Sequence, residues 1–567
     1  DARDAATLAS PPAASAGFRA ALAAPPAATT SVTVQVPASM RTAPFNTTRT
    51  LRVPPGWAAS VYARVGGARF MAVAPNGDLL VSNPGAGTVW LVRARAGGDP
   101  TVTAWASGLY RPHDVVFHAI DGQTWVYVAE GDKVARYRYT PGDSVGQGRE
   151  VLVTGLPSAR SPELGGSYGH ELKNIALSPA HELYVSVASI SNADPADVLA
   201  SPPRAAIWQY TASGGAMRVY ARGLRNAEGL AFVPGTSALW AAVNNRDNIG
   251  YPFHQDFTGD GTDDYGKILT AYVDDHPPEE FTRVVDGGNY GWPYCNPNPD
   301  TPAGLDDMPF DRDVQTNADG SRLDCATATR VSKGIQAHSA PLGLTFLQGT
   351  AAPMAWREGA AVALHGSWNR STPTGYKVAY FPWDAAAQRP GAQQDLFAGW
   401  LVGTSSWGRP VDVAAAPDGA LYVSDDATGT IYRFAYSEAP PPPAQAVTSF
   451  TLIDADTDQP IAGYDPIANG ASLNLNALPT RNLNVRANTT PATVGSVRFA
   501  LDGVANFRTD DAAPYALAGD TNGNYAAWTP ANGSHTLTAT PFAGAGATGA
   551  AGTARTITFS VKRTGKK

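Results

Sequence analysis

The stretch GLAFVPGTSALWAAVNN, residues 229–245, contains two apolar runs on either side of a PGTS turn. Apolar runs of this length around a turn containing Pro and Gly predict a β-hairpin. Polar residues stand at both of its ends, with Arg225 and Asn226 before the first run and Asn245, Arg246 and Asp247 after the second. Because the two ends of an antiparallel hairpin lie side by side, these polar side chains are expected to share one location.

The same unit recurs along the chain, and this repetition predicts the fold. Residues 51–438 contain six copies: FMAVAPNGDLLVSN (70–83), HDVVFHAIDGQTWVYVAE (113–130), NIALSPAHELYVSVAS (174–189), the stretch at 229–245, GLTFLQG to AAVALHGS (343–367) and DVAAAPDGALYVSD (412–425). Further strand-like stretches separate the copies. Six units of about four strands indicate an all-β, six-bladed β-propeller. Two stacked sandwiches are the competing architecture, but they would not explain one motif six times.

The remainder of the chain divides around this repeat. Residues 1–50 form an Ala/Pro-rich N-terminal segment, and the proline-rich stretch 439–445 is typical of a stiff linker. Residues 446–567 alternate in short runs separated by Asn/Gly/Asp turns, a pattern that predicts an Ig-like β-sandwich. A spacer role and a carbohydrate-binding role both fit that second domain.

Charge and cysteine content limit the classes of function. The net charge is −7 and the isoelectric point is near 5.7, which argue against a nucleic-acid partner. No apolar run is long enough for a membrane span. The two cysteines, Cys295 and Cys325, lie in a loop-rich stretch, where a disulfide is expected. A disulfide, and an N-terminus at Asp1 without an apolar leader, indicate a periplasmic or secreted protein.

In a propeller the hairpin ends would surround one mouth of the central channel, and they are rich in basic residues. The positions before the first runs are Arg111, His113, His170, Lys173, Arg225, Asn226, His338 and Arg409. Three of the chain's nine histidines therefore fall at the same structural position. Neutral histidine is the usual general base near pH 7, and arginine binds carboxylates and stabilises developing negative charge. Such a mouth suits a small polyanion together with a group that loses a proton.

Several of these segments together resemble the soluble PQQ-dependent sugar dehydrogenases. The matching stretches are GHELKN (169–174), GLRNAEGLAF (223–232), NNRDN (244–248), GGNYGWP (287–293), HSAPLGLTF (338–346), LHGSWNRS (364–371) and GRPVDV (408–413). The similarity covers about residues 51–438 and is greater to L-sorbosone-dehydrogenase-like, pyranose and aldose sugar dehydrogenases than to soluble glucose dehydrogenase.

The resemblance implies a quinoprotein that oxidises an aldose, pyranose or osone at C1 and passes electrons to an external acceptor. It implies that His170 removes the proton of the anomeric hydroxyl while hydride passes to PQQ, and that Arg225 polarises the quinone carbonyl. The residues implied to hold the cofactor are Lys173, Asn226, Glu228, Asn245, His338, Asn369, Arg370 and Arg409. Main-chain oxygens of Arg246 and Asp247 are implied to bind Ca²⁺, which prefers oxygen ligands. His113, Trp368 and Trp407 border the expected mouth and are candidates for contact with the sugar.

Three positions depart from the glucose-oxidising members. Ser189 stands where those enzymes have an Asp that orients the base, Glu228 replaces a Gln, and Val411 replaces an Arg. Glucose is therefore not the expected substrate.

A possible second calcium site and two alternative functions remain open. The loop DFTGDGTDDYG, residues 256–266, carries Asp256, Asp260, Asp263 and Asp264 around glycines, as in a Ca²⁺ loop, although an ordinary acidic turn has the same composition. A non-catalytic glycan-binding propeller and a Ca²⁺-dependent lactonase are the alternative functions. The lactonase would require carboxylates converging on the metal.

Overall fold

The computed structural model describes residues 29–437 and 445–565. Its contacts divide the chain between residues 437 and 438 into two compact units. Most of the expected linker at 439–445, and the first part of the N-terminal segment, lie outside the described residues. Within the described ranges, no helix combines the length and apolar character that crossing a bilayer requires.

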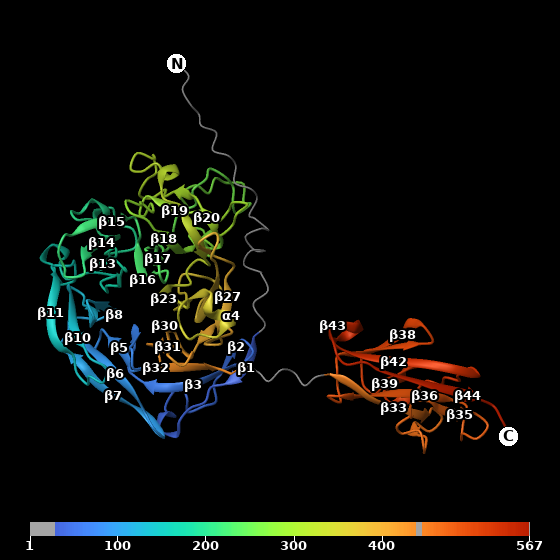
Figure 1. Cartoon of the computed structure of the whole chain (residues 1–567). Coiled ribbons are helices and arrows are strands. Elements are labelled where there is room, and N and C mark those ends of the chain that lie inside the picture. Colours follow the sequence, from blue (N-terminus) through green and yellow to red (C-terminus); the bar gives the residue numbers. More distant parts are fainter. Residues whose placement is uncertain (1–28, 438–444, 566–567) are drawn as a thin grey trace. The chain divides into compact units, whose positions relative to one another are not determined.

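The first unit is all-β and contains six sheets of four or five strands that follow one another along the chain (Figure 1). In the first three sheets the strands pair in sequence order: β4 (Met71–Val73), β5 (Leu79–Asn83), β6 (Thr88–Arg95) and β7 (Gly98–Ser107); β8 (Val115–Ile120), β9 (Gln123–Ala129), β10 (Lys133–Tyr139) and β11 (Gln147–Thr154); β12 (Ile175–Leu177), β13 (Glu182–Val187), β14 (Ala206–Thr211) and β15 (Arg218–Arg222).

The last three sheets are interrupted or completed by other segments. They comprise β16 (Asn226–Phe232), β17 (Leu239–Asn244), β18 (Glu279–Val284), β22 (Val331–Ile335) and β20 (Asp306–Met308); β23 (Pro341–Phe346), β24 (Gly359–Leu364), β25 (Lys377–Asp384), β26 (Arg389–Pro390) and β27 (Gln394–Phe397); and β30 (Pro410–Ala415), β31 (Leu421–Asp425), β32 (Thr430–Tyr436) and β3 (Trp57–Arg64). Strand β3 precedes the whole repeat in sequence yet pairs with β32, near its end.

The predicted hairpins are confirmed. In the hairpin that encloses the PGTS turn at 234–237, β16 pairs with β17, and Asn226 lies opposite Asn244. The first strands of the six sheets contact one another in a closed cycle, from β4 through β8, β12, β16, β23 and β30 back to β4. Hydrogen bonds also join the starts of these strands. The Met71 amide of β4 donates to Asp412 of β30, the Ile175 amide of β12 donates to Asp114 before β8, and Asn244, opposite the start of β16, donates to the Pro341 carbonyl of β23. The first strands therefore begin at the same end of the ring.

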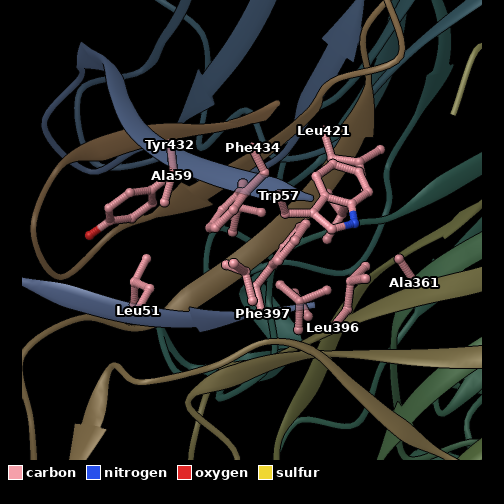
Figure 2. Packing of buried hydrophobic residues seen from close by; sticks show 14 of the residues in the cluster. Leu51, Trp57, Ala59, Ala361, Leu396, Phe397, Leu421, Tyr432 and Phe434 are labelled. Atoms are coloured by element: carbon pink, nitrogen blue, oxygen red, sulfur yellow. The ribbon is translucent and has the colours of Figure 1, made fainter. Parts of the chain in front are cut away.

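Hydrophobic clusters fill the space between neighbouring sheets. One contains Leu80 of the first sheet with Val128 of the second, and another contains Tyr127 of the second with Val185 of the third. The cluster at the closure combines Trp57 of β3, Phe397 of β27 and Phe434 of β32, with the rings of the two phenylalanines stacked 3.7 Å apart (Figure 2). Alternate residues of β3 are buried, as expected for a strand with one face against a core.

Part of the N-terminal segment also belongs to this first unit. Strand β1 (Thr30–Thr33) pairs with β2 (Thr50–Val53), and the 3₁₀ turn at Ala38–Met40 lies between them. Val34, Met40 and Phe45 are buried in the closure cluster. Through these three side chains, residues 30–50 pack onto the core of this unit.

Long connections in the fourth sheet form a separate lobe. It includes the helix α3 (Thr270–Val273), the pair β19 (Cys295–Pro297) and β21 (Phe310–Arg312), and the 3₁₀ turn Cys325–Thr327. The expected disulfide between Cys295 and Cys325 is confirmed. The other short elements are the 3₁₀ turn Pro162–Leu164, α2 (Ala196–Leu199), α4 (Met354–Arg357), β28 (Leu401–Val402) and β29 (Ser405–Ser406).

The second unit consists of two sheets around one core. The first sheet contains β34 (Gln459–Pro460), β33 (Ala446–Asp454), β36 (Leu483–Thr490) and β39 (Tyr515–Ala516); the second contains β35 (Ala471–Asn474), β44 (Arg555–Lys562), β42 (Gly533–Gly544), β37 (Ser496–Leu501), β38 (Val504–Asp510) and β43 (Thr548–Ala551). A two-stranded hairpin, β40 (Asp520–Thr521) and β41 (Asn524–Tyr525), and a 3₁₀ turn at Ala545–Ala547 complete the unit. Phe450 and Val485 of one sheet pack with Phe499 and Leu537 of the other.

Replacing Phe434 by Ala is expected to destabilise the first unit by about 3–5 kcal/mol, because it removes a fully buried ring from the closure cluster. Urea unfolding followed by tryptophan fluorescence measures the change. Val402→Ala is the control, since Val402 is 67% exposed and its truncation should change stability by less than about 0.5 kcal/mol. Equal midpoints for the two variants would show that the ring does not depend on this closure.

Removing the disulfide through Cys295→Ala with Cys325→Ala is expected to lower the free energy of unfolding by roughly 3–4 kcal/mol, since the bond closes a loop with a sequence separation of 30. Denaturant titration of the wild type with and without reductant, compared with the double variant, measures it. Reductant should leave the variant unchanged. A loss below about 1 kcal/mol would mean that the lobe is held together by its other contacts.

Candidate functional site

Six basic side chains lie at the beginning of the six first strands. Each sheet supplies one of them a few residues before its first strand: Arg69, His113, Lys173, Arg225, His338 and Arg409. Five of these were predicted from the sequence, and Arg69 was not. Because the first strands contact one another and begin at the same end of the ring, the six side chains gather at that end. This end is the candidate functional site.

His170 is held there as a neutral imidazole, and its Nε2 has no hydrogen-bond partner among residues 29–437 and 445–565. Its Nδ1 lies 3.0 Å from the main-chain oxygen of Ser189 and 2.9 Å from the Ser189 hydroxyl. A carbonyl oxygen only accepts, so Nδ1 carries the hydrogen and Nε2 keeps its lone pair. Burial, and then the charge of Arg225, lower the pKa of His170 to about 4. Ser189 therefore orients this ring. From the sequence, Ser189 was identified only as the position where the glucose-oxidising members have an Asp.

Arg225 is buried beside His170 and is held by Asn192, which sequence reasoning missed. The Arg225 Nε donates to the Asn192 main-chain oxygen at 3.1 Å, and Nη2 donates to Asn192 Oδ1 at 3.2 Å. The same Oδ1 accepts the amide of Asp247 at 2.8 Å, and Asn192 Nδ2 donates to the Asp247 carbonyl at 2.9 Å. One asparagine thus joins the guanidinium to the loop after β17. Asn192 lies between repeat copies, where no pattern marks it.

Asp247 connects this group to His338. Its carboxylate lies 3.8 Å from Arg225 and 3.4 Å from Nδ1 of His338, whose Nε2 is 2.7 Å from the Val273 carbonyl. Burial disfavours the imidazolium, but the hydrogen bond to Asp247, the charge of Glu279 and the Val273 carbonyl outweigh it and raise the pKa of His338. These contacts favour the imidazolium form of His338, which has a positive φ of 63°.

His113 and Lys173 lie deeper than the sequence suggested. His113 is completely buried against Phe70, and burial together with the charge of Arg69 lowers its pKa well below the usual value. His113 has no solvent-exposed surface in this structure, and its contact with a sugar stays a prediction. Lys173 is also fully buried; its ammonium donates to the Glu171 carbonyl and lies 4.8 Å from the ring centre of Tyr168. Burial lowers the pKa of Lys173 to about 7.

Arg409 directly precedes the first strand of the sixth sheet, and Asp426 directly follows the second strand of the same sheet. The Arg409 guanidinium donates to the carbonyls of His365 at 3.1 Å and Gly366 at 3.3 Å. The carboxylate of Asp426 accepts from Arg69 at 2.9 Å and lies 2.9 Å from Nε2 of His365. Asp426 therefore links the beginning of the first sheet to the fifth.

Asn369 and Arg370 line a cavity of about 280 Å³ together with Asn248 and Trp368. Arg370 is tied to the Asp274 carbonyl and, at 3.0 Å, to the Asp275 carboxylate. The buried Nδ2 of Asn369 makes no hydrogen bond to any described residue. Trp368 is 75% exposed, so its indole is free to stack on a ligand.

The loop Asn245–Asp247 is fixed by buried acids. The Asn245 amide donates to Glu279 at 2.5 Å, and its side chain donates to Glu280 at 3.0 Å. Burial raises the pKa of Glu279 to about 7 and that of Glu280 to about 8. The side chain of Arg246 pairs with Asp313 and binds Gln315, which ties this loop to the disulfide-bonded lobe.

The acidic loop at 256–264 does not present converging carboxylates. Asp256 accepts the amides of Gly259, Asp260 and Gly261, and Asp264 accepts those of Phe257 and Thr258 while pairing with Lys267. Asp260 binds Thr262, and Asp263 contacts His254. In residues 29–437 and 445–565, no three His, Cys, Asp or Glu side chains are grouped to hold a metal. Local hydrogen bonds therefore occupy the loop's four aspartates in this structure.

Trp407 packs against the N-terminal segment. Its indole lies 6.1 Å from Phe45 and 6.3 Å from Trp400, measured between ring centres, and its Nε1 donates to the Gly399 carbonyl. The ring is half-buried, and its contact with a sugar stays a prediction.

Nuclear magnetic resonance of histidine-labelled protein checks the state of His170. The His170 signal is identified as the one missing from the spectrum of His170→Gln. It is expected to show a neutral, Nδ1-protonated imidazole that becomes charged only near pH 4, because burial and Arg225 oppose the charge. His181, which is exposed at the opposite end of its hairpin, provides the internal comparison. A midpoint near 6.5 for His170 would contradict the geometry described above.

Comparison with known proteins assigns the chain to a family. Residues 51–436 match the TrAA12-like family, and the chain belongs to it. A curated protein of Borreliella burgdorferi with no assigned function is 26% identical over 223 residues, which are 39% of this chain and 49% of that protein. A pyrroloquinoline quinone-dependent pyranose dehydrogenase of Coprinopsis cinerea is 33% identical over 125 residues, 19% of this chain and 16% of that protein. The chain thus spans half or less of these relatives.

Solved structures support the fold. The holo form of the PQQ domain of pyranose dehydrogenase from Coprinopsis cinerea aligns with a TM-score of 0.54 at 23% identity, covering 68% of this chain and 96% of that one. A calcium structure of a family AA12 enzyme from Trichoderma reesei aligns with a TM-score of 0.54 at 22% identity, over 68% and 97%. The shared portion corresponds in extent to the six-sheet unit.

Proposed function

We propose that the chain is a PQQ-dependent dehydrogenase that oxidises a sugar at C1 and passes the electrons to an external acceptor. The observation that carries the proposal is the pairing of His170, a neutral imidazole with a free Nε2, with the buried guanidinium of Arg225 at the end of the ring where all first strands begin. Family membership and the names of the relatives point to the same chemistry.

The residues at this end fit an anionic quinone. PQQ carries carboxylates, and here Lys173 is fully buried with a carbonyl as its hydrogen-bond partner, while the buried Nδ2 of Asn369 has no partner among the described residues. A buried cation is stabilised by an anion placed next to it. Lys173, Asn226, Asn369 and Arg409 would hold the cofactor, with His338 and Asn245 shaping its site.

In this proposal the chain's own groups divide the work. PQQ, when bound, accepts the hydride of the sugar C1. His170 Nε2 takes the proton of the C1 hydroxyl, and the Ser189 contacts keep the ring in the tautomer that can do so. Arg225 supplies positive charge where negative charge develops, and Asn192 keeps it in place. The exposed indole of Trp368 would stack on the sugar.

A calcium ion belongs to the same proposal. The main-chain oxygens of Arg246 and Asp247 lie in a loop fixed by Asn192, Glu279 and Glu280. The Asp247 carbonyl already accepts one hydrogen bond but has a second lone pair. Hard oxygen ligands of this kind suit Ca²⁺, which would be completed by oxygens of the cofactor.

We further infer that the six sheets are the blades of a six-bladed propeller, closed by β3, and that residues 446–567 form an Ig-like sandwich. The cyclic contacts of the first strands support the first inference, and two sheets around one core support the second. A second binding module and a spacer are both compatible with the sandwich. The disulfide supports a periplasmic or secreted location.

Turnover with PQQ, Ca²⁺ and a redox dye over a panel of aldoses, osones and uronic sugars tests the function. His170→Gln is expected to lower kcat by roughly 10²–10⁴-fold while changing the Kd for PQQ by less than about threefold, because it removes the base but no cofactor contact. His181→Asn is the matched control, since His181 is exposed and its positive φ of 61° is tolerated by Asn. A wild type that shows neither turnover nor a PQQ-dependent absorbance change would refute the proposal.

A further inference from the structure

Glu228 is a buried carboxyl group that the proposed chemistry leaves without a role. It lies on β16, two residues after Asn226, and is 6% exposed. The pairing of β16 with β17 skips from Ala227 to Gly229, so Glu228 is the extra residue of a β-bulge. Bulges redirect a side chain and are common beside active sites. This one turns a carboxyl group into the interior, among the groups that precede the first strands.

The two carboxyl oxygens of Glu228 differ in their hydrogen bonding. Oε1 accepts the side-chain amide of Asn226 at 3.2 Å. Oε2 is buried and makes no hydrogen bond within residues 29–437 and 445–565. It lies 3.7 Å from His113 Nε2, which already accepts from Arg69 Nη2 at 3.3 Å, and 3.9 Å from Arg69 Nη2. A buried charged oxygen without a hydrogen bond is costly, and this cost favours the protonated form of Glu228.

The charged and titratable groups that face Glu228 come from the first, second and third sheets. Arg69 precedes β4 and already pairs with Asp426; His113 is neutral, and Asp114 beside it is a buried carboxyl whose pKa is raised to about 7. Lys173, before β12, is the remaining cation. Burial raises the pKa of Glu228, and Arg69, Asn226 and Lys173 oppose that increase. The carboxylate form therefore depends on two cations that an anionic ligand would also use.

We propose that Glu228 takes up a proton when an anionic cofactor binds beside Asn226, and that its neutral carboxyl group then positions the Asn226 amide. The proton comes from solvent, so the step is carboxylate plus H⁺ giving the carboxylic acid, with no electrons transferred. Arg69 and Lys173 stabilise the negative charge of the cofactor. They then stabilise the buried carboxylate of Glu228 less, so that its protonated form is favoured. This inference rests on the proposed function, and Glu228 acts as a positioning residue.

Proton counting during cofactor binding tests the inference. PQQ with Ca²⁺ is titrated calorimetrically into the full chain near pH 7 in buffers of different ionisation enthalpy, and the slope of heat against that enthalpy gives the protons taken up. The wild type is expected to take up about half to one proton more than Glu228→Gln. Glu182→Gln is the matched control, because Glu182 lies at the far end of β13, bonded to Ser178 and Tyr184, and should match the wild type.

The pH dependence of affinity gives a second readout that a purely structural role would not alter. Binding favours the protonated carboxyl, so the Kd of the wild type should rise with pH between 6 and 8 more steeply than that of Glu228→Gln, by up to about tenfold per pH unit. Glu228→Asp retains a titrating group and should retain part of the difference.

The outcomes separate the two proposals. PQQ binding with equal proton counts and equal pH slopes in wild type and Glu228→Gln would overturn the role of Glu228 and leave the proposed function intact. No PQQ binding by the wild type would overturn both. If Glu228→Gln does not fold, infrared difference spectra of the wild type decide: a new band of a protonated carboxyl group on PQQ addition supports the inference, and its absence refutes it.

Discussion

The first strands of all six sheets begin at the same end of the ring, and the candidate site depends on that constraint. Strand β3, from before the repeat, pairs with β32, and the first strands contact one another in a complete cycle. Antiparallel hairpins then place each entry beside its partner's exit. Side chains separated by hundreds of residues, such as Arg69 and Asp426, thereby become hydrogen-bond partners.

Closure also determines the electrostatics of the site. Side chains at the beginning of the first strands are surrounded by other sheets and lose solvent, which disfavours whichever form carries charge. This lowers the pKa of His170 and Lys173 and raises that of Asp114. Burial likewise raises the pKa of Glu279 and Glu280, at the start of β18. The pKa of His338 is raised instead, because Asp247 and the Val273 carbonyl contact its two nitrogens.

Much of this arrangement could be predicted from the sequence, since the hairpins are local and the repeat makes their ends equivalent. The β16–β17 hairpin, the disulfide and the basic positions on five of the six sheets followed from periodicity, turn residues and spacing. Burial by distant segments could not be predicted: His113 packs against Phe70 and contacts Arg69, and Trp407 packs against Phe45. Asn192 and Glu279 escaped notice because their partners are main-chain groups of other loops, which leave no pattern in the sequence.

If PQQ binds between His170 and Arg225 at one end of the ring, a crystal structure determined with PQQ and Ca²⁺ will show it. We expect difference density for the quinone at the beginning of the first strands, in contact with Arg225 and within reach of His170 Nε2. An ion peak is expected beside the main-chain oxygens of Arg246 and Asp247. Quinone density on any other surface, with this end of the ring unchanged, would contradict the proposal.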